Sequence, residues 1–274
     1  IAYIKLPKEK QFSIGGEIWY PSAFNYTVIA KDENAGLNSV YVIESTINED
    51  GSFETKSDVI ERGVIMDGEY TDFADMTDSF TKEAKYQYRI EDEGDYRIAV
   101  DAQDNAGNKL SHPNNSNVIT QTVHIDKTDP EITRFMFSDK NDEGVDVERG
   151  TYGFYFIDDT KVRVCVKDDG NSSGINYVTL YCRDVNGQEK SVKVYSSDED
   201  YHDENGEEYA EFTIEKGFKG QIWALAADNV ASENPFEDGF AHTSGLRYTD
   251  GSIVEDAELH QSVSGITISE DIQT

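Results

Sequence analysis

The sequence is poor in the residues that disulfide-rich and membrane proteins depend on. Among its 274 residues are only two cysteines, Cys165 and Cys182, which cannot build a disulfide framework. No apolar run approaches the roughly 20 residues that cross a bilayer. These shortages argue against a disulfide-stapled domain and against membrane insertion within this segment.

Catalytic motifs are missing as well. The chain has no Gly-x-Ser-x-Gly, His-Glu-x-x-His, Walker or dinucleotide-binding pattern, and its five histidines show no metal-ligand spacing. With 55 acidic residues a carboxylate pair can be drawn almost anywhere, so such a pair carries no information about catalysis. We therefore expect a protein that is not an enzyme.

Positive charge is also scarce. Asp and Glu total 55 against 24 Lys and Arg, which gives a formal net charge of −31. A field of this sign repels nucleic acids and anionic lipid surfaces, so neither is expected as a partner. Cation binding or a strongly solvated exterior is favoured instead.

Residues typical of β-structure are abundant. The chain contains 16 Tyr and 13 Phe beside many Val and Ile, which suits thin β-sandwiches better than a large enzyme core. No convincing amphipathic helix is present, and short period-two segments are separated by turn residues. Because the length suffices for two domains of ordinary size, we expect an all-β chain of two antiparallel β-sandwiches.

Residues 96–132 indicate where the first domain ends. YRIAVDA and VITQTVHI read as its two closing strands, and Asp126–Pro130 (DKTDP) follows them. Proline blocks strand continuation and stiffens the exit. We expect domains at residues 1–127 and 128–258, with 259–274 a linker or, through SGITIS, the opening strand of a further repeat.

Internal repetition supports two copies of one domain. Residues 16–32 align without a gap on 152–168, each giving an aromatic-rich strand, a short break, a second strand and an acidic stop. Residues 88–105 align without a gap on 212–229. Two matched blocks in the same order predict a tandem repeat.

Turn residues divide each copy into hairpins. Asp50-Gly51 and Asn186-Gly187 follow matched strands, and Asn205-Gly206 marks a third hairpin in the second copy. Such pairs favour type I′ turns, whose two central residues both have positive φ. Type I′ hairpins are the prediction at these positions.

Three segments of the sequence carry a family resemblance: VRVCVKDDGNSSGINYVTLY, VDAQDNAGNKLS and the linker HIDKTDPEI. They resemble the bacterial immunoglobulin-like repeats of Gram-positive secreted and cell-wall proteins. The second copy departs from the family's corner pattern, since it reads AADNVASENPFE and continues in a long excursion to His242. The resemblance implies two tandem immunoglobulin-like sandwiches in an extracellular, secreted or wall-attached protein. Such repeats serve as spacers, adhesin segments or accessory domains beside a catalytic domain.

The same resemblance sets the expected context of the chain. It begins at Ile1 without Met or a signal peptide, so it is expected to be an excerpt from a longer protein whose neighbouring domains are partners. An environmental or host glycan or protein is the other partner class. A Lys–Asn isopeptide bond, known in related surface domains, cannot be assigned from the sequence.

A calcium site is one candidate for chemistry. Asp101, Asp104 and Asn105 cluster at one predicted strand end, and Asp126 with Asp129 lies in the linker. Carboxylate and amide oxygens are the ligands Ca²⁺ prefers, so the five could converge at the joint between domains. The alternative is that these residues only cap turns through local hydrogen bonds.

An aromatic patch on the second copy is the other candidate. Alternation directs Tyr177, Tyr181, Trp223 and Leu225 to one outward face, which would suit a glycan or protein ligand. The alternative is that residues 230–242 fold back over that face. The inward positions are predicted to be Val178, Leu180, Ile222, Ala224 and Ala226.

Strand phase also bears on the two cysteines. Cys165 lies outside the inward set of its strand, whereas Cys182 follows the inward set, so unpaired thiols are favoured.

The sequence thus indicates a non-enzymatic spacer or ligand-binding stalk. The competing hypothesis is a carbohydrate-binding accessory region of a secreted glycoside hydrolase.

Overall fold

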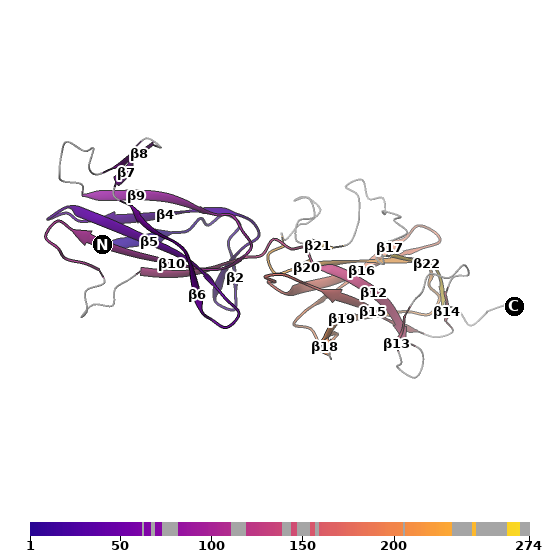
Figure 1. The fold of residues 1–274 in the computed structure, drawn as a ribbon. Coiled ribbons are helices and arrows are strands. Elements are labelled where there is room, and N and C mark those ends of the chain that lie inside the picture. Colours follow the sequence, from indigo (N-terminus) through magenta and orange to yellow (C-terminus); the bar gives the residue numbers. More distant parts are fainter. Residues whose placement is uncertain are drawn as a thin grey trace. The chain divides into compact units, whose positions relative to one another are not determined.

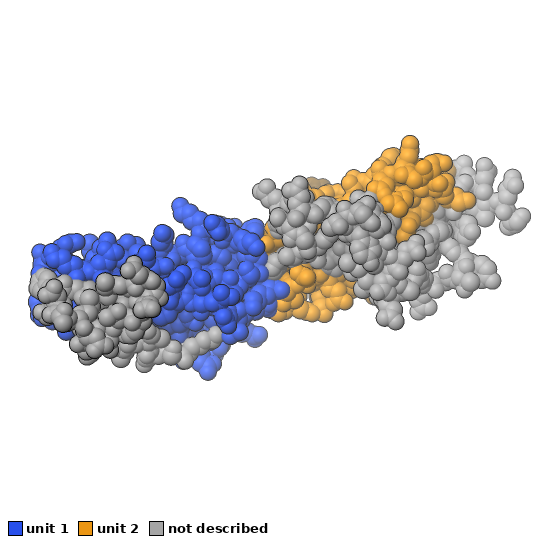
Figure 2. All heavy atoms as spheres, turned by 90° about the horizontal axis from the view of Figure 1, so that it is seen from above, with its two compact units in different colours: residues 1–127 blue, residues 128–274 orange. Residues whose placement is uncertain are grey.

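The computed structural model divides the chain into two compact units, residues 1–127 and 128–274 (Figures 1 and 2). No helix in the described part of the chain is long and apolar enough to span a membrane. The described residues are 1–61, 63–66, 69–72, 82–110, 119–138, 144–146, 154–156, 159–204, 206–231, 243–244 and 262–268.

Unit 1 is built from two main sheets. One sheet has the strand order β1-β4-β9 and the other the order β2-β3-β11-β10-β5-β6, while β7 and β8 pair only with each other in the described part. Apart from the parallel β3–β11 pair, neighbouring strands are antiparallel. The strands are β1 (Ala2–Lys5), β2 (Phe12–Ile14), β3 (Glu17–Tyr20), β4 (Phe24–Lys31), β5 (Leu37–Ile47), β6 (Phe53–Glu61), β7 (Gly63–Met66), β8 (Glu69–Asp72), β9 (Glu83–Ile90), β10 (Gly94–Asp104) and β11 (Ile119–Ile125).

The core of unit 1 is rich in tyrosine. Tyr20, Tyr26 and Tyr96 are each 1% exposed, and all belong to the apolar cluster that both main sheets line. Their hydroxyl groups stay hydrogen-bonded: Tyr20 donates to Pro7 O (2.8 Å) and Tyr96 to Asp92 O (3.0 Å). Tyr20 and Tyr96 therefore contribute large buried area while their hydroxyl groups stay satisfied.

Unit 2 repeats this arrangement. One sheet has the order β13-β12-β15-β19-β18 and the other β14-β22-β20-β16-β17, with β21 added to β20. The strands are β12 (Glu131–Ser138), β13 (Gly144–Asp146), β14 (Phe154–Phe156), β15 (Thr160–Lys167), β16 (Ile175–Asp184), β17 (Glu189–Tyr195), β18 (Tyr201–Glu204), β19 (Glu207–Ile214), β20 (Lys219–Asp228), β21 (Thr243–Ser244) and β22 (Ser262–Ile268).

The strand orders of the two units share a common central part. β1-β4-β9 corresponds to β12-β15-β19, and β3-β11-β10-β5-β6 corresponds to β14-β22-β20-β16-β17. The parallel β3–β11 pair has its counterpart in the parallel β14–β22 pair. The chain is therefore all-β and β-sandwich-like in its described residues, with one topology used twice.

The C-terminal strand corrects one prediction. SGITIS was expected to lie in a linker or to open a further repeat, but Ser262–Ile268 forms β22 inside unit 2. It pairs with β20 through Ile222↔Val263 and Gly220↔Ile266, in the position that β11 holds beside β10. The reason is that β20 needs a partner on the side opposite β16, and this later strand supplies it.

The predicted inward set of the second copy is confirmed. Val178 and Leu180 on β16 lie in the apolar core of unit 2, as do the alternate residues of β20 from Ile222 to Ala226. Because the side chains of a strand point alternately to its two faces, the phase read from the sequence fixes this assignment. The opposite face, which carries Trp223, is described below.

The hairpin turns form at the predicted places but not with the predicted geometry. At Asn186-Gly187 only the glycine has positive φ (81°), and the same holds at Asp50-Gly51 (77°). The N–H of Asp184 donates to Gln188 O (2.9 Å), and that of Gly187 donates to Asp184 O (3.0 Å). This pattern is a three-residue loop, a type I turn followed by a left-handed glycine, rather than type I′. Asn205 lies outside the described residues.

The carboxylate of Asp184 explains this choice of turn. Its Oδ1 accepts the N–H groups of Asn186 (2.9 Å) and Gln188 (2.8 Å), which holds the first loop residues in a right-handed conformation. The corner after β10 uses the same device, since Asp104 Oδ1 accepts from Ala106 (2.9 Å) and Asn108 (2.8 Å). Side-chain acceptors therefore select the turn type at both places.

The Asp184 turn should respond to acid. The backbone N–H of Gln188 and the groups of Asn186 hold the pKa of Asp184 below its usual range. A lowered pKa stabilises the fold above the unfolded pKa of about 4, and this contribution is lost as pH falls through the folded value. We expect Asp184→Asn, which keeps an acceptor but cannot ionise, to lose less stability between pH 6 and pH 2 than wild type.

Thermal melts across this pH range provide the measurement, and Asp184→Ala is the companion variant. It removes the acceptor altogether, so its melting temperature should be lower than that of wild type at pH 6, by less than a core substitution would cause. Identical acid profiles for wild type and Asp184→Asn would contradict the assignment.

Candidate functional site

The predicted calcium ligands that belong to unit 1 do not come together. β10 and β11 are antiparallel, with Gly94 opposite Ile125. Asp104 and Asn105 therefore lie at one end of the sheet and Asp126, just after β11, at the other. The intervening 11-residue strand spans on the order of 30 Å, whereas ligand oxygens lie about 2.3–2.6 Å from a Ca²⁺ ion. A single ion shared by Asp104 and Asp126 is therefore ruled out, which corrects the sequence-based hypothesis.

The remaining members of that set lie in different surroundings. Asp101 Oδ1 accepts the N–H of Ala102 (2.8 Å). Asp126 is fully buried, and its own N–H donates to Tyr20 O (3.1 Å). Asp129 is an exposed residue of the segment that precedes β12.

Asp104 acts as a turn cap. Besides its two backbone donors, its Oδ2 accepts the side-chain amide of Asn108 at 2.7 Å. These hydrogen bonds, the strongest of them with Asn108, hold the pKa of Asp104 below its usual range. The capping interpretation, left open by the sequence, therefore describes this residue.

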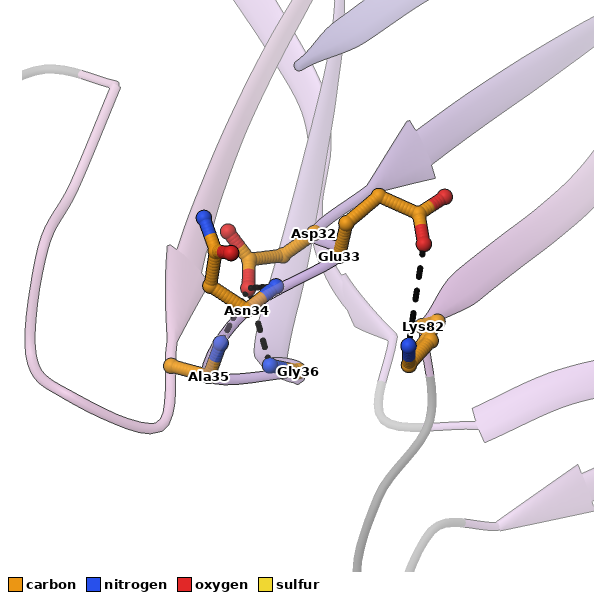
Figure 3. Close-up of polar contacts among 6 residues, drawn as sticks. All are labelled: Asp32, Glu33, Asn34, Ala35, Gly36 and Lys82. Carbon is orange, nitrogen blue, oxygen red and sulfur yellow. Dashed lines mark hydrogen bonds and ion pairs between the residues drawn. The ribbon is translucent and has the colours of Figure 1, made fainter.

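Asn105 connects this corner to the neighbouring turn. Its side-chain amide donates to Ala35 O and its backbone N–H to Gly36 O, each at 2.9 Å. That turn is itself capped by Asp32, whose Oδ1 accepts the N–H groups of three consecutive residues at 3.1, 2.7 and 2.8 Å (Figure 3). Glu33 beside it pairs with Lys82 at 3.7 Å. Two loops distant in sequence are thereby fixed to each other.

Unit 2 has the same polar end. Asn229 occupies the place of Asn105, and its side-chain amide donates to the carbonyl oxygens of Ser173 and Gly174 at 2.9 Å. Asp168 occupies the place of Asp32 and accepts the Ser172 hydroxyl at 2.6 Å. The repeated sequence blocks KD and DN thus build one structural feature twice.

Two acidic side chains come close together at this end of unit 2. A carboxylate oxygen of Asp168 lies within 4.8 Å of one of Asp228, and Asp228 is fully buried. Asp228 Oδ1 also accepts the N–H of Val230 at 2.8 Å. Two carboxylates this close repel unless a proton or a cation lies between them. Sequence reasoning missed both residues, although their repeat positions were available as a signal.

The predicted aromatic patch forms, but it is buried. Trp223 and Tyr181 face each other across β20 and β16 and stack with ring centroids 5.4 Å apart and planes inclined by 4°. Trp223 and Leu225 are each 3% exposed and Tyr177 is 7% exposed. The expected open platform is therefore corrected to a packed cluster on the outer face of the sheet.

Part of this face is covered by the chain that directly follows β20. Tyr177 and Leu225 pack with Ala227 and Ala231, so the chain leaving β20 contributes to the cover. This contact agrees with the alternative that residues 230–242 return over the face, of which Val230 and Ala231 are described and both buried. Residues 232–242 lie outside the described part of the chain.

Cations and one exposed ring mark the rim of this cluster. The Lys193 ammonium lies 3.6 Å from the centre of the Tyr177 ring, and burial lowers the pKa of this lysine. The Arg183 guanidinium lies 5.5 Å from the Trp223 ring. Tyr195 contacts Tyr177 edge to face at 5.9 Å and is 45% exposed. An external ligand would meet this rim before the buried rings.

The two cysteines are free and protected from reaction. Cys165 is fully buried, although its phase places it outside the core set, and Cys182 is half-buried. Burial raises the pKa of both thiols to about 11. Because the thiolate is the reactive form, neither is suited to act as a nucleophile at neutral pH.

The geometry defines an all-β, β-sandwich-like protein with capped polar strand ends and a closed aromatic cluster. No protein-family model matches the chain, and no curated protein matches it either. The arrangement of the residues is therefore the basis of the functional inference.

Proposed function

We propose that the chain is a non-enzymatic structural module of a bacterial extracellular or wall-attached protein. In this proposal its two units are tandem immunoglobulin-like sandwiches that act as a spacer or a ligand-binding stalk. The correspondence of strand order between the units is the observation that carries it. The resemblance of three sequence segments to bacterial immunoglobulin-like repeats supports the location.

The use of polar side chains supports the same conclusion. At the strand ends Asp32, Asp104 and Asn105 are engaged in hydrogen bonds within unit 1, and Asn229 is engaged likewise within unit 2. Side chains that are hydrogen-bonded within the turns of their own unit serve to stabilise the fold, as expected of a structural module. Negative charge of −31 would also keep closely spaced stalks soluble.

Mechanical unfolding tests the spacer function. Stretching the whole chain by its ends should give two separate unfolding steps, one per unit, each releasing on the order of 40 nm of chain. The same preparation should show no hydrolysis of glycan or peptide substrates. One cooperative step for the whole chain, or turnover that copurifies with it, would contradict the proposal.

A carbohydrate-binding accessory region of a secreted glycoside hydrolase is the second candidate. The rim of Tyr195, Tyr177 and Lys193 favours it, because a partly exposed aromatic ring is suited to stack on a sugar. A glycan array with wild type and Tyr195→Ala separates the candidates. Saturable binding that this variant loses supports the accessory role, and no binding by the folded chain favours the spacer.

Calcium remains part of the proposal at a different place. We expect Ca²⁺ to raise the melting temperature of unit 2 through the Asp168–Asp228 pair, since an ion bound only by the native state stabilises it. The gain is about 2.7 kcal/mol when free Ca²⁺ is roughly 100 times the Kd. Asp228→Asn should abolish the shift.

Asp104→Asn is the matched control for calcium, because it changes the equivalent residue of unit 1. This variant should keep the full Ca²⁺ shift. An unchanged melt of wild type in millimolar Ca²⁺ against chelator would mean that the carboxylates share a proton. If Asp104→Asn instead abolished the Ca²⁺-induced rise in melting temperature, the calcium site would lie in unit 1.

A further inference from the structure

A histidine between two carboxylates lies on the outer face of the larger sheet of unit 1. His124 on β11 has its Nδ1 2.6 Å from Asp95 Oδ1 and its Nε2 3.6 Å from Glu17 Oε2. Its side chain is 14% exposed, and its ring stacks on that of Trp19 at 4.6 Å with planes inclined by 18°. The imidazole thus touches residues of both neighbouring strands.

These contacts join strands whose backbone connection is short. β3 pairs with β11 through only two residue pairs in the described structure, His124↔Trp19 and Ile125↔Tyr20. Beyond β3 lies β2, which pairs with β3 alone among the described strands. The attachment of the β2–β3 hairpin to the sheet therefore depends strongly on side chains at this point.

The charges around the imidazole favour its protonated form. Burial lowers the pKa of His124, but the hydrogen bond and charge of Asp95, together with the negative charge of Glu17, outweigh burial and raise the pKa above 6.5. Of the other charged groups, Arg97 on β10 has its guanidinium over the Phe53 ring at 5.0 Å, and Asp126 is the first residue after β11. β2 reads Phe-Ser-Ile and adds no charge.

Protonation decides what the Glu17 contact does. A protonated imidazole has an N–H on each nitrogen and is attracted to both carboxylates. A neutral imidazole has one N–H, which the shorter contact to Asp95 uses. Its Nε2 then presents a lone pair to the Glu17 carboxylate, so that an attraction between β11 and β3 becomes a repulsion.

We propose that His124 is a pH-dependent clamp, which holds the β2–β3 hairpin to the sheet of unit 1 while protonated and loosens it on deprotonation. This device is independent of the spacer function. Because the folded pKa is raised, its stabilising contribution is fully present below the unfolded pKa of about 6.5 and is lost as pH rises through the folded value. The equilibrium for hairpin opening should rise about tenfold for each unit of pKa difference.

Amide hydrogen exchange in the whole chain, with chelator present, tests the clamp. Protection of the β2 and β3 amides, corrected for intrinsic exchange rates, should be greater at pH 6 than at pH 9 in wild type. His124→Gln should abolish this difference. His202→Gln, which alters a histidine in contact with the Tyr209 ring in unit 2, should leave this difference unchanged.

Glu17→Gln separates the clamp from a purely structural role of the ring. Glu17 is 59% exposed, so the variant should fold, and the NMR titration of His124 should move to lower pH with weaker β3 protection at pH 6. Equal wild-type protection at both pH values, or an unmoved titration, would overturn the proposal. Zn²⁺ that restores protection at pH 9 would overturn it too, because the site would then take a metal.

Discussion

Replacing Gly220 by alanine should destabilise unit 2 by about 3 kcal/mol or more, one of the largest effects of any single methyl group in this protein. A Cβ at this position would lie 2.0 Å from Arg183 O and 2.9 Å from Asp184 Cα, both backbone atoms of the neighbouring strand. Backbone cannot rotate away as a side chain can. The β16–β20 pairing, which joins Asp184 to Gly220, would have to separate locally.

Because of its position in the sheet, a substitution at Gly220 should destabilise the whole of unit 2 and not only the local strand pairing. The register of β20 against β22 shifts between Gly220 and Gln221, so the strand is irregular at the residue whose Cβ would meet the backbone of β16. Glycine in a strand often marks such close backbone approach. Because β20 is central in its sheet, loss of pairing there should reach the core of unit 2.

Gly187→Ala is the matched control for Gly220→Ala. Gly187 has positive φ (81°) with nothing within 4 Å of its Cβ, so alanine there is strained but not blocked, at a cost of about 1–2 kcal/mol. Urea unfolding of both variants measures the difference. If Gly220→Ala lowered the free energy of unfolding no more than Gly187→Ala does, the close approach of the Gly220 backbone to Arg183 O would be contradicted.

Trp223→Ala should cost about 3–5 kcal/mol, because it removes a large ring that is 3% exposed and leaves a cavity. The loss includes the stack on Tyr181 and the contact with Arg183. Denaturant unfolding followed by far-ultraviolet circular dichroism would measure it, since the variant loses one of the two tryptophans. The effect should be confined to the transition of unit 2.

Tyr195→Ala provides the comparison for Trp223→Ala. Tyr195 is 45% exposed at the rim of the same cluster, so its removal should cost less than about 1 kcal/mol. If Trp223→Ala lost little unfolding free energy, the Trp223 ring would be accessible to solvent. The prediction of an exposed aromatic patch would then stand again. Until stability is measured, lost glycan binding in Trp223→Ala cannot be separated from lost folding, whereas Tyr195→Ala can report on binding.

The predicted sharing of one calcium ion by Asp104 and Asp126 failed for a reason that strand direction explains. Consecutive antiparallel strands end at opposite edges of a sheet, so the residues after β10 and those after β11 cannot meet. Residues that do meet lie at the ends of β15 and β20: Asp168 directly follows β15, and Asp228 is the last residue of β20. Their proximity depends on the path of a whole unit, and no local pattern expresses it.

The sequence by itself determined the features that local periodicity encodes. Alternation at period two assigned Ile222 to the core and Trp223 to the opposite face, because the pleat fixes that relation whatever the rest of the chain does. Turn residues likewise marked where strands end. Only the tertiary structure decided that the outward rings are covered, that β22 completes unit 2 and that Asp168 meets Asp228, since each depends on segments far apart in sequence.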